Sequence, residues 1–342
     1  MSFHSILEGN KFFISGYYVQ FCVSRFFMLR VSNISFSYRD TITLKNISFS
    51  IPKGQNTAII GESGCGKSTL LQLIYGLYDL NEGQIFWNET EVLGPKFNLI
   101  PGMEFMKYLA QDFDLMPYIT VAENIGKFLS NRNLKKKEAR VQELLAIVEM
   151  SEFASVKAQF LSGGQMQRVA IAKVLALEPE VLLLDEPFSH IDNFRKNSLR
   201  RKLFGYLKEK DITCIIATHD SKDILAFTDQ TLVIQKGELL ANAATKSLYN
   251  LPENRYIASL FDEITEIPKH FIEETEDQDA TVLLYPFQLQ VVSDSKFKVE
   301  IRQSYFKGNG YLVEANFNNQ PVFFENSFAL EKGNWVFLAL KP

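Results

Sequence analysis

The sequence predicts an α/β domain with helices on both faces of a sheet, followed by a small all-β domain. Strand-like apolar runs alternate with helical segments between residues 29 and 262, a pattern typical of α/β folds. One short buried run, residues 57–60, leads into a glycine-rich loop and then an apolar helix. Residues 281–340 are rich in Phe, Val and Tyr without a helical period, which favours strands.

Length and composition favour an ordinary globular chain. The 342 residues correspond to about two domains, and 46% are hydrophobic and 22% charged, which excludes a disordered chain. The net charge of −4 provides no general attraction toward nucleic acid or anionic lipid, so no nucleic-acid partner is expected. Cys22, Cys65 and Cys214 are too scattered for a disulfide framework or zinc cluster, which fits a reducing cytosol.

Residues 1–27 are expected to be an extension outside the fold, because a clean strand pattern begins directly after Met28. The longest uncharged stretch, residues 12–24, is 13 residues long, and no run of 18 uncharged apolar residues occurs in the chain. Neither is long enough for a membrane-spanning helix. A signal peptide would need a basic start and a small-residue cleavage site, and neither is clear here.

The elements of the first half follow from apolar spacing. Residues 29–51 alternate and break at 39–40, which predicts two antiparallel strands; a turn is expected at 52–54 and a helix at 67–75. Residues 134–150 predict an amphipathic helix. Its apolar face is expected to carry Leu134, Val141, Leu144, Leu145 and Val148. The lysines at 135–137 favour a solvated helix start over a partner-binding patch.

In the second half, residues 165–177 predict a buried helix ended by Pro179. Residues 181–184 and 213–217 are apolar runs typical of central strands of a parallel sheet, and a charged amphipathic helix is expected at 193–210. Residues 262–279 carry eight acidic side chains. A metal site there is conceivable, but a solvated linker is the preferred interpretation.

The strongest chemical signal is a glycine-rich loop between a buried strand and an apolar helix. It reads Gly61-Glu62-Ser63-Gly64-Cys65-Gly66-Lys67-Ser68, which is the phosphate-loop pattern in its confirming context. Glycines let backbone N–H groups converge on phosphate oxygens, and the helix N-terminus adds its positive dipole end. Lys67 would neutralise the β- and γ-phosphates and Ser68 would bind Mg²⁺. The alternative is a glycine-rich turn that binds nothing.

A second signal is the acidic pair that follows the apolar run 181–184. Asp185 can hold Mg²⁺, usually through water, and Glu186 can polarise the attacking water as general base. The pair alone is a weak pattern, equally typical of a capped strand. Together with the phosphate loop it indicates nucleotide hydrolysis.

A third signal is the run 161–168, with the letters LSGGQMQR. Ser162 is expected to be a helix N-cap, followed by Gly163, Gly164 and Gln165, which leave amides bare for an anion. The plain alternative is a capped helix. Because one ATP cannot easily use two phosphate-binding helix ends of one domain, the second end should face another subunit's ATP. These residues therefore predict a dimer.

Taken together, these motifs resemble the ATP-binding subunits of ABC transporters, over about residues 29–262. The resemblance implies a P-loop NTPase fold of the ABC type, a mixed sheet with flanking helices plus an antiparallel β subdomain and a helical subdomain. It extends the nucleotide-binding set to Thr69 and implies roles for four further residues. Tyr38 would stack on adenine, Gln111 would contact Mg²⁺ and sense the membrane subunit, Asp192 would link the two ATP sites, and His219 would donate to the γ-phosphate. Ile191 replaces the Leu usual beside Asp192.

The tail narrows the resemblance. Residues 248–259 are similar to the corresponding segment of importer ATPases for maltose, ferric iron, sulfate and polyamines, which continue into a small β-barrel of TOBE type. Tyr285-Pro286-Phe287 stands where those proteins commonly show Arg-Pro-Glu, so any regulatory contact made by those charges would differ. The expected organisation is an extension at 1–27, an ATP-binding domain at 28–262, an acidic linker at 263–280 and a TOBE-like domain at 281–342.

The resemblance implies an ATP-hydrolysing importer subunit that uses ATP and Mg²⁺. It would work as a homodimer on transmembrane permease subunits at the cytoplasmic face of the inner membrane, and would serve a solute-binding protein indirectly. The cargo is chosen by separate chains. An exporter-type ATPase remains an alternative, although the all-β tail argues against it. A soluble ATPase acting on ribosomes or DNA would be expected to show a second nucleotide domain or a long coiled coil, and the sequence shows neither. A degenerate regulator would be expected to lack Glu186 or His219, and both residues are present.

Overall fold

The computed structural model describes residues 11–14, 17–20, 28–39, 41–275, 277 and 279–342. The chain forms two compact units. Of the described residues, those up to Thr57 form the first unit together with residues 66–216 and 236–239. The second unit comprises those of residues 58–65, 217–235 and 240–342. Within the expected extension, β1 (Lys11–Ile14) pairs antiparallel with β2 (Tyr17–Gln20). The other residues of the expected extension, Cys22 among them, lie outside the described part of the chain. That the extension lies outside the fold stays a prediction.

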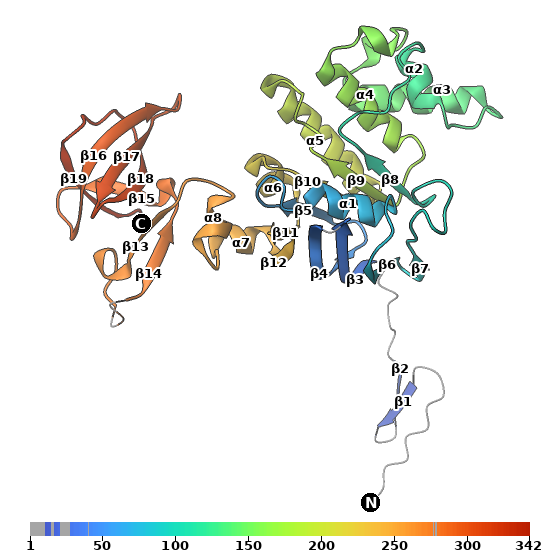
Figure 1. The fold of residues 1–342 in the computed structure, drawn as a ribbon. Helices are drawn as coiled ribbons and strands as arrows, with labels where there is room; N and C mark the ends of the chain where they lie inside the picture. Colours follow the sequence, from blue (N-terminus) through green and yellow to red (C-terminus); the bar gives the residue numbers. More distant parts are fainter. Residues whose placement is uncertain (1–10, 15–16, 21–27, 40, 276, 278) are drawn as a thin grey trace, which may run out of the picture. The chain divides into compact units, whose positions relative to one another are not determined.

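An antiparallel sheet opens the first unit (Figure 1). It consists of β4 (Thr41–Pro52), β3 (Met28–Tyr38), β6 (Glu82–Trp87) and β7 (Thr90–Glu91), in that spatial order. Alternate β3 side chains are buried, among them Leu29, which pairs with Ile51 of β4. The expectation of two antiparallel strands in this part of the chain is confirmed.

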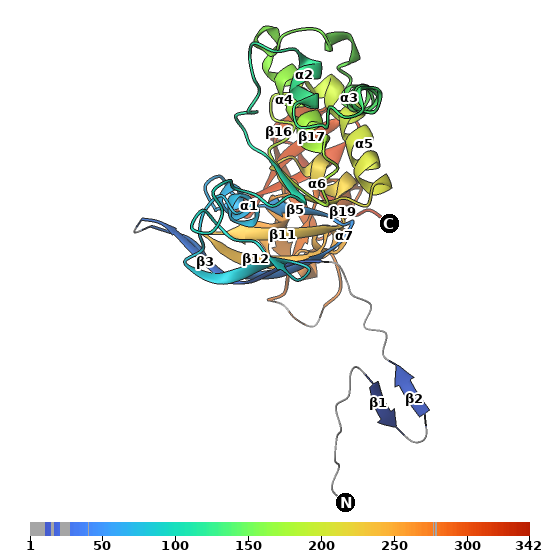
Figure 2. The same ribbon diagram turned by 90° about the vertical axis from the view of Figure 1, so that its right-hand side faces the viewer.

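Five helices belong to the described residues of the first unit. They are α1 (Lys67–Tyr75), α2 (Val121–Gly126), α3 (Leu134–Ile147), α4 (Gly163–Leu175) and α5 (Asn193–Glu209), with 3₁₀ turns η1 (Ser151–Phe153) and η2 (Ala158–Phe160). Both ribbon views show α2, α3 and α4 lying together as a helical layer (Figures 1 and 2). Helix α4 ends at Leu175, earlier than the expected stop before Pro179.

The expected apolar face of α3 is correct except at its start. Val141, Leu144, Leu145 and Val148 are buried, but Leu134 is 61% exposed. Residues 134–136 form an exposed first turn after the N-cap Asn133, so this leucine has the right spacing but is not covered by the rest of the fold. The apolar face of α3 is therefore buried from Val141 onward, and its expected first member, Leu134, is exposed.

Six strands form one sheet in the order β12-β11-β5-β10-β9-β8. Their bounds are Glu238–Ala244, Gln230–Gln235, Asn56–Ile60, Thr213–Ala217, Val181–Asp185 and Met106–Leu109. Every residue of β5, β9 and β10 is buried, as expected for strands covered on both faces. Strands β8 and β9 run parallel, which brings the ends of these two strands to the same edge.

The second unit adds α6 (Ser221–Phe227), α7 (Thr245–Asn250) and α8 (Arg255–Ser259), and a β-rich C-terminal region. Five antiparallel strands there are ordered β15-β19-β16-β17-β18. Their bounds are Leu289–Val292, Trp335–Leu340, Phe297–Phe306, Tyr311–Phe317 and Gln320–Asn326, and the 3₁₀ turn η4 (Pro286–Gln288) precedes them. Phe297 and Phe324 are fully buried in this core. The expected all-β tail is present.

The expected acidic linker differs from the structure. Its residues include β13 (Thr265–Pro268), paired with β14 (Thr281–Leu284), and the 3₁₀ turn η3 (Lys269–Phe271). Ile267 is 1% exposed and belongs to the β core. The acidic side chains hide a short period-2 pattern in which Thr265 and Ile267 point inward, since alternate residues of a strand face opposite sides.

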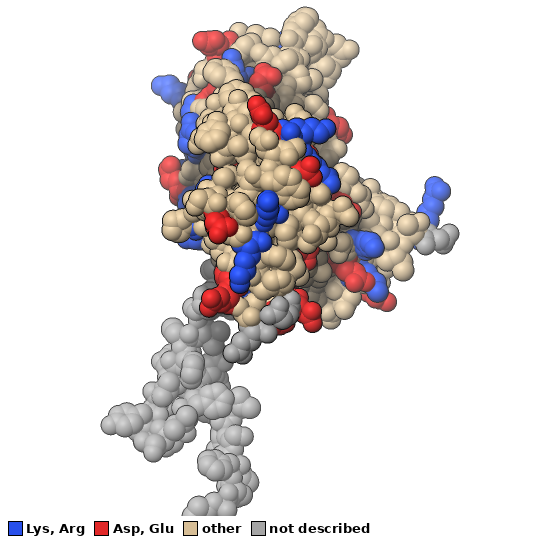
Figure 3. All heavy atoms as spheres, turned by 90° about the vertical axis from the view of Figure 1, so that its left-hand side faces the viewer, with Lys and Arg blue, Asp and Glu red and all other residues tan. Residues whose placement is uncertain are grey.

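On the face drawn in Figure 3, basic and acidic side chains are interspersed, in keeping with the small net charge. Among the residues that the structure describes, no helix is both long enough and apolar enough to cross a bilayer.

Candidate functional site

The phosphate loop lies between the buried strand β5 and helix α1, as expected. Gly61 has a φ of +148°, and a Cβ there would lie 2.1 Å from the Ile234 carbonyl oxygen. Gly66, the N-cap of α1, has a φ of +110°, and a Cβ would lie 2.6 Å from Leu44 Cδ2. Within the described chain, α1 has no side-chain cap and no acidic residue in its first turn. The positive end of this helix is therefore suited to an external anion.

Asp185 is the centre of the polar cluster next to this helix start. It ends β9 and is 3% exposed. The Tyr108 hydroxyl donates to Asp185 Oδ2 over 3.3 Å. Burial raises the pKa of Asp185, while hydrogen bonds from Ser68 and Tyr108, the charge of Lys67 and a hydrogen bond from Gln111 oppose the rise. The structure thus brings together four predicted site residues, Lys67, Ser68, Gln111 and Asp185.

The cluster has the chemistry of a magnesium site. Asp185 Oδ1 is buried and accepts no hydrogen bond from the described residues, and a buried carboxylate oxygen normally has a partner. Hydroxyl, amide and carboxylate oxygens are ligands that Mg²⁺ prefers, and it is often held by one or two carboxylates plus substrate phosphates. No group of three or more His, Cys, Asp or Glu side chains that could hold a metal occurs among the described residues. The donors around Asp185 therefore fit Mg²⁺ bound together with a nucleotide.

Glu186 has an unusual backbone conformation. Its φ is +48°, a region that non-glycine residues occupy at some energetic cost. Its carbonyl oxygen accepts hydrogen bonds from Gln167 Nε2 at 2.9 Å, Ser189 Oγ at 3.0 Å and Ser189 N at 3.2 Å. Gln167 Oε1 in turn accepts from His190 N at 3.0 Å. Helix α4 therefore supplies a buried side chain that holds the turn containing Glu186.

The start of α4 is a capping box. Gln165 N donates to Ser162 Oγ at 3.4 Å, and Ser162 N donates to Gln165 Oε1 at 2.8 Å, which confirms Ser162 as the N-cap. A Cβ on Gly164 would lie 2.6 Å from the His190 carbonyl oxygen. Glycine at 164 thus allows the first turn of α4 to pack directly on the loop that follows Glu186.

Two further predicted site residues are at element boundaries. Asp192 is the exposed N-cap residue of α5, and the neighbouring Ile191 is buried, so the exchange from Leu is accommodated. His219 is exposed and follows β10. Its neighbour Thr218 donates from its N–H to the Ile59 carbonyl oxygen at 3.3 Å, which places the histidine segment beside the strand that leads into the phosphate loop.

Tyr38, at the end of β3, lies over the start of α1. Its hydroxyl donates to Gln72 Oε1 at 3.3 Å and lies 3.5 Å from Thr69 Oγ1. The side chain remains 40% exposed. An exposed ring beside a phosphate-binding helix can stack on a nucleotide base.

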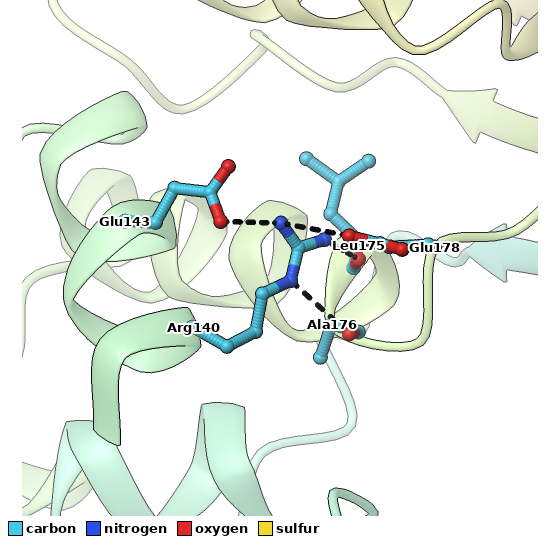
Figure 4. Close-up of polar contacts among 5 residues, drawn as sticks. All are labelled: Arg140, Glu143, Leu175, Ala176 and Glu178. Atoms are coloured by element: carbon cyan, nitrogen blue, oxygen red, sulfur yellow. Dashed lines mark hydrogen bonds and ion pairs between the residues drawn. The ribbon is translucent and has the colours of Figure 1, made fainter. Parts of the chain in front are cut away.

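The other end of α4 is held by Arg140 of α3 (Figure 4). Its guanidinium donates to the carbonyl oxygens of Leu175 at 2.7 Å and Ala176 at 3.4 Å. It also pairs with Glu143 at 2.8 Å and Glu178 at 3.5 Å. A cation at a helix C-terminus satisfies free carbonyls and complements the dipole.

Sequence reasoning missed three contributors, Tyr108, Gln167 and Arg140. Gln167 stands inside the run 161–168 that the sequence singles out, and Tyr108 stands three residues before Gln111, but their partners Glu186 and Asp185 come later in the chain. The only local signal was a polar side chain on a buried face of a strand or helix.

Comparisons with known proteins agree with this geometry. The family model described as ABC transporter matches residues 44–189. The Fe(3+) ions import ATP-binding protein FbpC of Haemophilus influenzae (strain 86-028NP) is 30% identical over 322 residues, covering 87% of this chain and 92% of that protein. The spermidine/putrescine import ATP-binding protein PotA of Thermotoga maritima is 36% identical over 250 residues, covering 72% of this chain and 67% of that protein.

Solved structures of ATP-binding cassette proteins are similar to this chain as well. The cbiO1 protein of Clostridium perfringens, part of the ABC transporter complex cbiONQ, superposes with a TM-score of 0.59 at 30% identity, covering 67% of this chain and 92% of that one. The dimeric, post-hydrolysis cassette MJ0796, bound to ADP and Pi, gives 0.57 at 27% identity, covering 64% and 98%.

A phosphate loop beside a buried carboxylate at a strand end defines a P-loop nucleotide hydrolase. The chain belongs to the ABC transporter family, as an ATP-binding and ATP-hydrolysing subunit of the importer type. The fold class and the function expected from the sequence are confirmed.

Proposed function

We propose that Asp185 and its neighbours hold Mg²⁺ with ATP, and that this site powers a permease as one half of a dimer. The observation that supports it best is the buried Asp185 Oδ1, which no described hydrogen-bond donor satisfies, beside Ser68, Gln111 and Lys67. A carboxylate in this state favours a cation. The open N-terminus of α1 is the matching place for the phosphates.

In this proposal the phosphate loop, residues 61–69, holds the triphosphate, with Lys67 neutralising its charge. Ser68, Gln111 and Asp185 hold Mg²⁺, which neutralises charge on the β- and γ-phosphate oxygens when bound. Tyr38 stacks on the adenine.

Glu186 acts as general base in the proposed reaction. Its carboxylate takes a proton from the attacking water while the water oxygen bonds to the γ-phosphorus and the bond to ADP breaks. The three hydrogen bonds to the Glu186 carbonyl fix its backbone for that task. His219 donates a hydrogen bond to the γ-phosphate.

The second helix start, Ser162 to Gln165, and Asp192 would serve the ATP of a second copy of the chain. A homodimer is supported by the dimeric cassette MJ0796. Attachment to permease subunits is supported by cbiO1, part of a transporter complex. The relatives are named for import of ferric ions and polyamines. We place this chain at the cytoplasmic face of the inner membrane, serving a solute-binding protein through the permease.

The magnesium assignment is tested by the affinity for ATP, measured by calorimetry with and without Mg²⁺. Asp185→Asn should bind ATP with little dependence on Mg²⁺, because the amide retains the shape but not the charge. Asp211→Asn, at an exposed carboxylate paired with Lys53, is the matched control and should keep the wild-type dependence. An Asp185→Asn protein with an unchanged Mg²⁺ dependence would contradict the assignment.

A further inference from the structure

The chain reverses direction after α1 through a glycine cap. Gly76 has a φ of +77°, with hydrogen bonds from Gly76 N to Leu73 O at 3.0 Å and from Leu77 N to Gln72 O at 2.9 Å. This pattern ends a helix in a tight left-handed turn. The turn brings Tyr78 back toward the end of β3, where Tyr38 lies.

The segment after Tyr78 is hydrogen-bonded to β3 through Asn81. Ser37 N donates to Asn81 Oδ1 at 2.8 Å, and Asn81 N donates to Ser35 O at 3.2 Å. The position of Tyr78 is therefore fixed from both ends, by the glycine cap before it and by Asn81 after it.

Three aromatic rings meet here. The Tyr78 and Tyr38 centroids are 5.4 Å apart with planes at 87°, and the Phe36 and Tyr38 centroids are 4.8 Å apart at 88°. Phe36 and Tyr78 are 5.6 Å apart at 34°. Edge-to-face pairs at such distances are favourable. A hydrogen bond with Tyr38 is the main cause that raises the pKa of Tyr78, ahead of burial.

The contacts fix the whole Tyr38 side chain. Phe36 and Tyr78 set the plane of its ring, and Gln72 and Thr69 hold its hydroxyl. A ring ordered before binding loses less conformational freedom when a ligand stacks on it.

We propose that Tyr78 is a positioning residue for the nucleotide base, acting through Tyr38. The inference rests on the proposed role of Tyr38 in stacking on adenine. Tyr78 then contributes to affinity for the base and not to binding of the phosphates or to the chemical step.

The test compares two ligands on the full chain, ATP and tripolyphosphate, which lacks base and ribose. Tyr78→Ala should weaken ATP binding about 3- to 10-fold, the effect of losing one aromatic pair. Its tripolyphosphate affinity should stay at the wild-type level, and KM for ATP should rise at constant kcat. Tyr78→Phe, which keeps the ring, should restore most of the ATP affinity. Tyr118→Ala, at a strongly exposed tyrosine, is the control and should bind both ligands normally.

Each other result decides against the inference in a distinguishable way. Equal losses for both ligands in Tyr78→Ala would mean damage to α1, not positioning of the base. If Tyr38→Ala weakens ATP selectively but Tyr78→Ala does not, this inference fails and the proposed function stands. If Tyr38→Ala has no selective effect, the adenine role fails with it. The double variant should bind ATP no more weakly than Tyr38→Ala, and additive losses would also overturn the inference.

Discussion

The side-chain amide of Gln167 donates a 2.9 Å hydrogen bond to the main-chain oxygen of Glu186. The same side chain accepts from His190 N, so one buried residue of α4 spans the turn that follows β9. Glu186 occupies a left-handed conformation, so these bonds hold its main chain in an otherwise unfavourable geometry.

Gln167→Met, which keeps the volume but removes the side-chain hydrogen bonds to Glu186 O, Ser189 Oγ and His190 N, should therefore lower kcat about tenfold with little change in KM for ATP. Losing these buried hydrogen bonds should also cost about 1–3 kcal/mol of stability. Steady-state kinetics and thermal unfolding measure the two effects. If kcat stays at the wild-type level while the protein is destabilised, Gln167 is purely structural.

The hydrogen bonds of Arg140 to the C-terminus of α4 are expected to stabilise the fold. Arg140→Met leaves the Leu175 and Ala176 carbonyls without their charged donor, at a cost of about 1.5–3 kcal/mol. Arg140→Lys should fall between, since an ammonium cannot reproduce the fork of donors. Lys135→Met, exposed on the same helix, serves as the control. A melting temperature of Arg140→Met equal to that of the control would rule out this stabilising role of Arg140.

Glu149 predicts a pH dependence. Its Oε1 accepts from Lys202 Nζ at 2.7 Å and Ser198 Oγ at 2.5 Å, and the hydrogen bond with Lys202 is the main cause that lowers its pKa below the ordinary 4.5. The folded state therefore binds fewer protons than the unfolded state near this value, so the stabilisation is present above pH 4.5 and lost as the pH falls through the lowered pKa. Glu149→Gln should lower the melting temperature at pH 7, and the difference should shrink in acid. A difference that is constant with pH would contradict the ion pair.

The pairing of β13 with β14 indicates where the chain can be truncated and still fold. All nucleotide motifs precede residue 262, whereas β13 pairs with β14 and buries Ile267 in the β core. Removing residues 263–342 should leave basal ATP hydrolysis near normal. Removing only residues 281–342 deletes β14 and leaves β13 without its pairing strand. The shortened protein should therefore be less soluble. Loss of hydrolysis in the folded shorter chain would show that the β region takes part in the site.

Local sequence was sufficient where a feature is contiguous. The phosphate loop needs only a buried strand, glycines and Lys67-Ser68 in succession, and α1 begins and ends where the apolar pattern indicated, at Lys67 and Tyr75. Asp185 at the end of an apolar run was found for the same reason. The roles assigned to all the site residues, Asp185, Glu186 and His219 among them, remain predictions.

What the sequence could not provide depends on distant partners. Tyr108 reaches Asp185 across 77 residues of chain, and no local pattern marks such a pair. Helical spacing placed Leu134 on the apolar face, but spacing does not indicate which positions of that face the rest of the fold covers, and Leu134 is exposed. In β13 the acidic composition concealed two inward positions, because a four-residue strand offers too little alternation to recognise.

In the proposed mechanism Glu186 activates water in a site that binds Mg²⁺ and ATP, and the Glu186→Gln variant isolates that step. Glu186→Gln retains shape but removes the base, so single-turnover phosphate release should fall about 10²–10⁴-fold while ATP affinity by calorimetry is unchanged. Circular dichroism must first show that the variant is folded like the wild type. We expect an ATP-bound dimer to accumulate, visible by size-exclusion chromatography with ATP and Mg²⁺. A folded Glu186→Gln protein that hydrolyses ATP at the wild-type rate would exclude Glu186 as the general base.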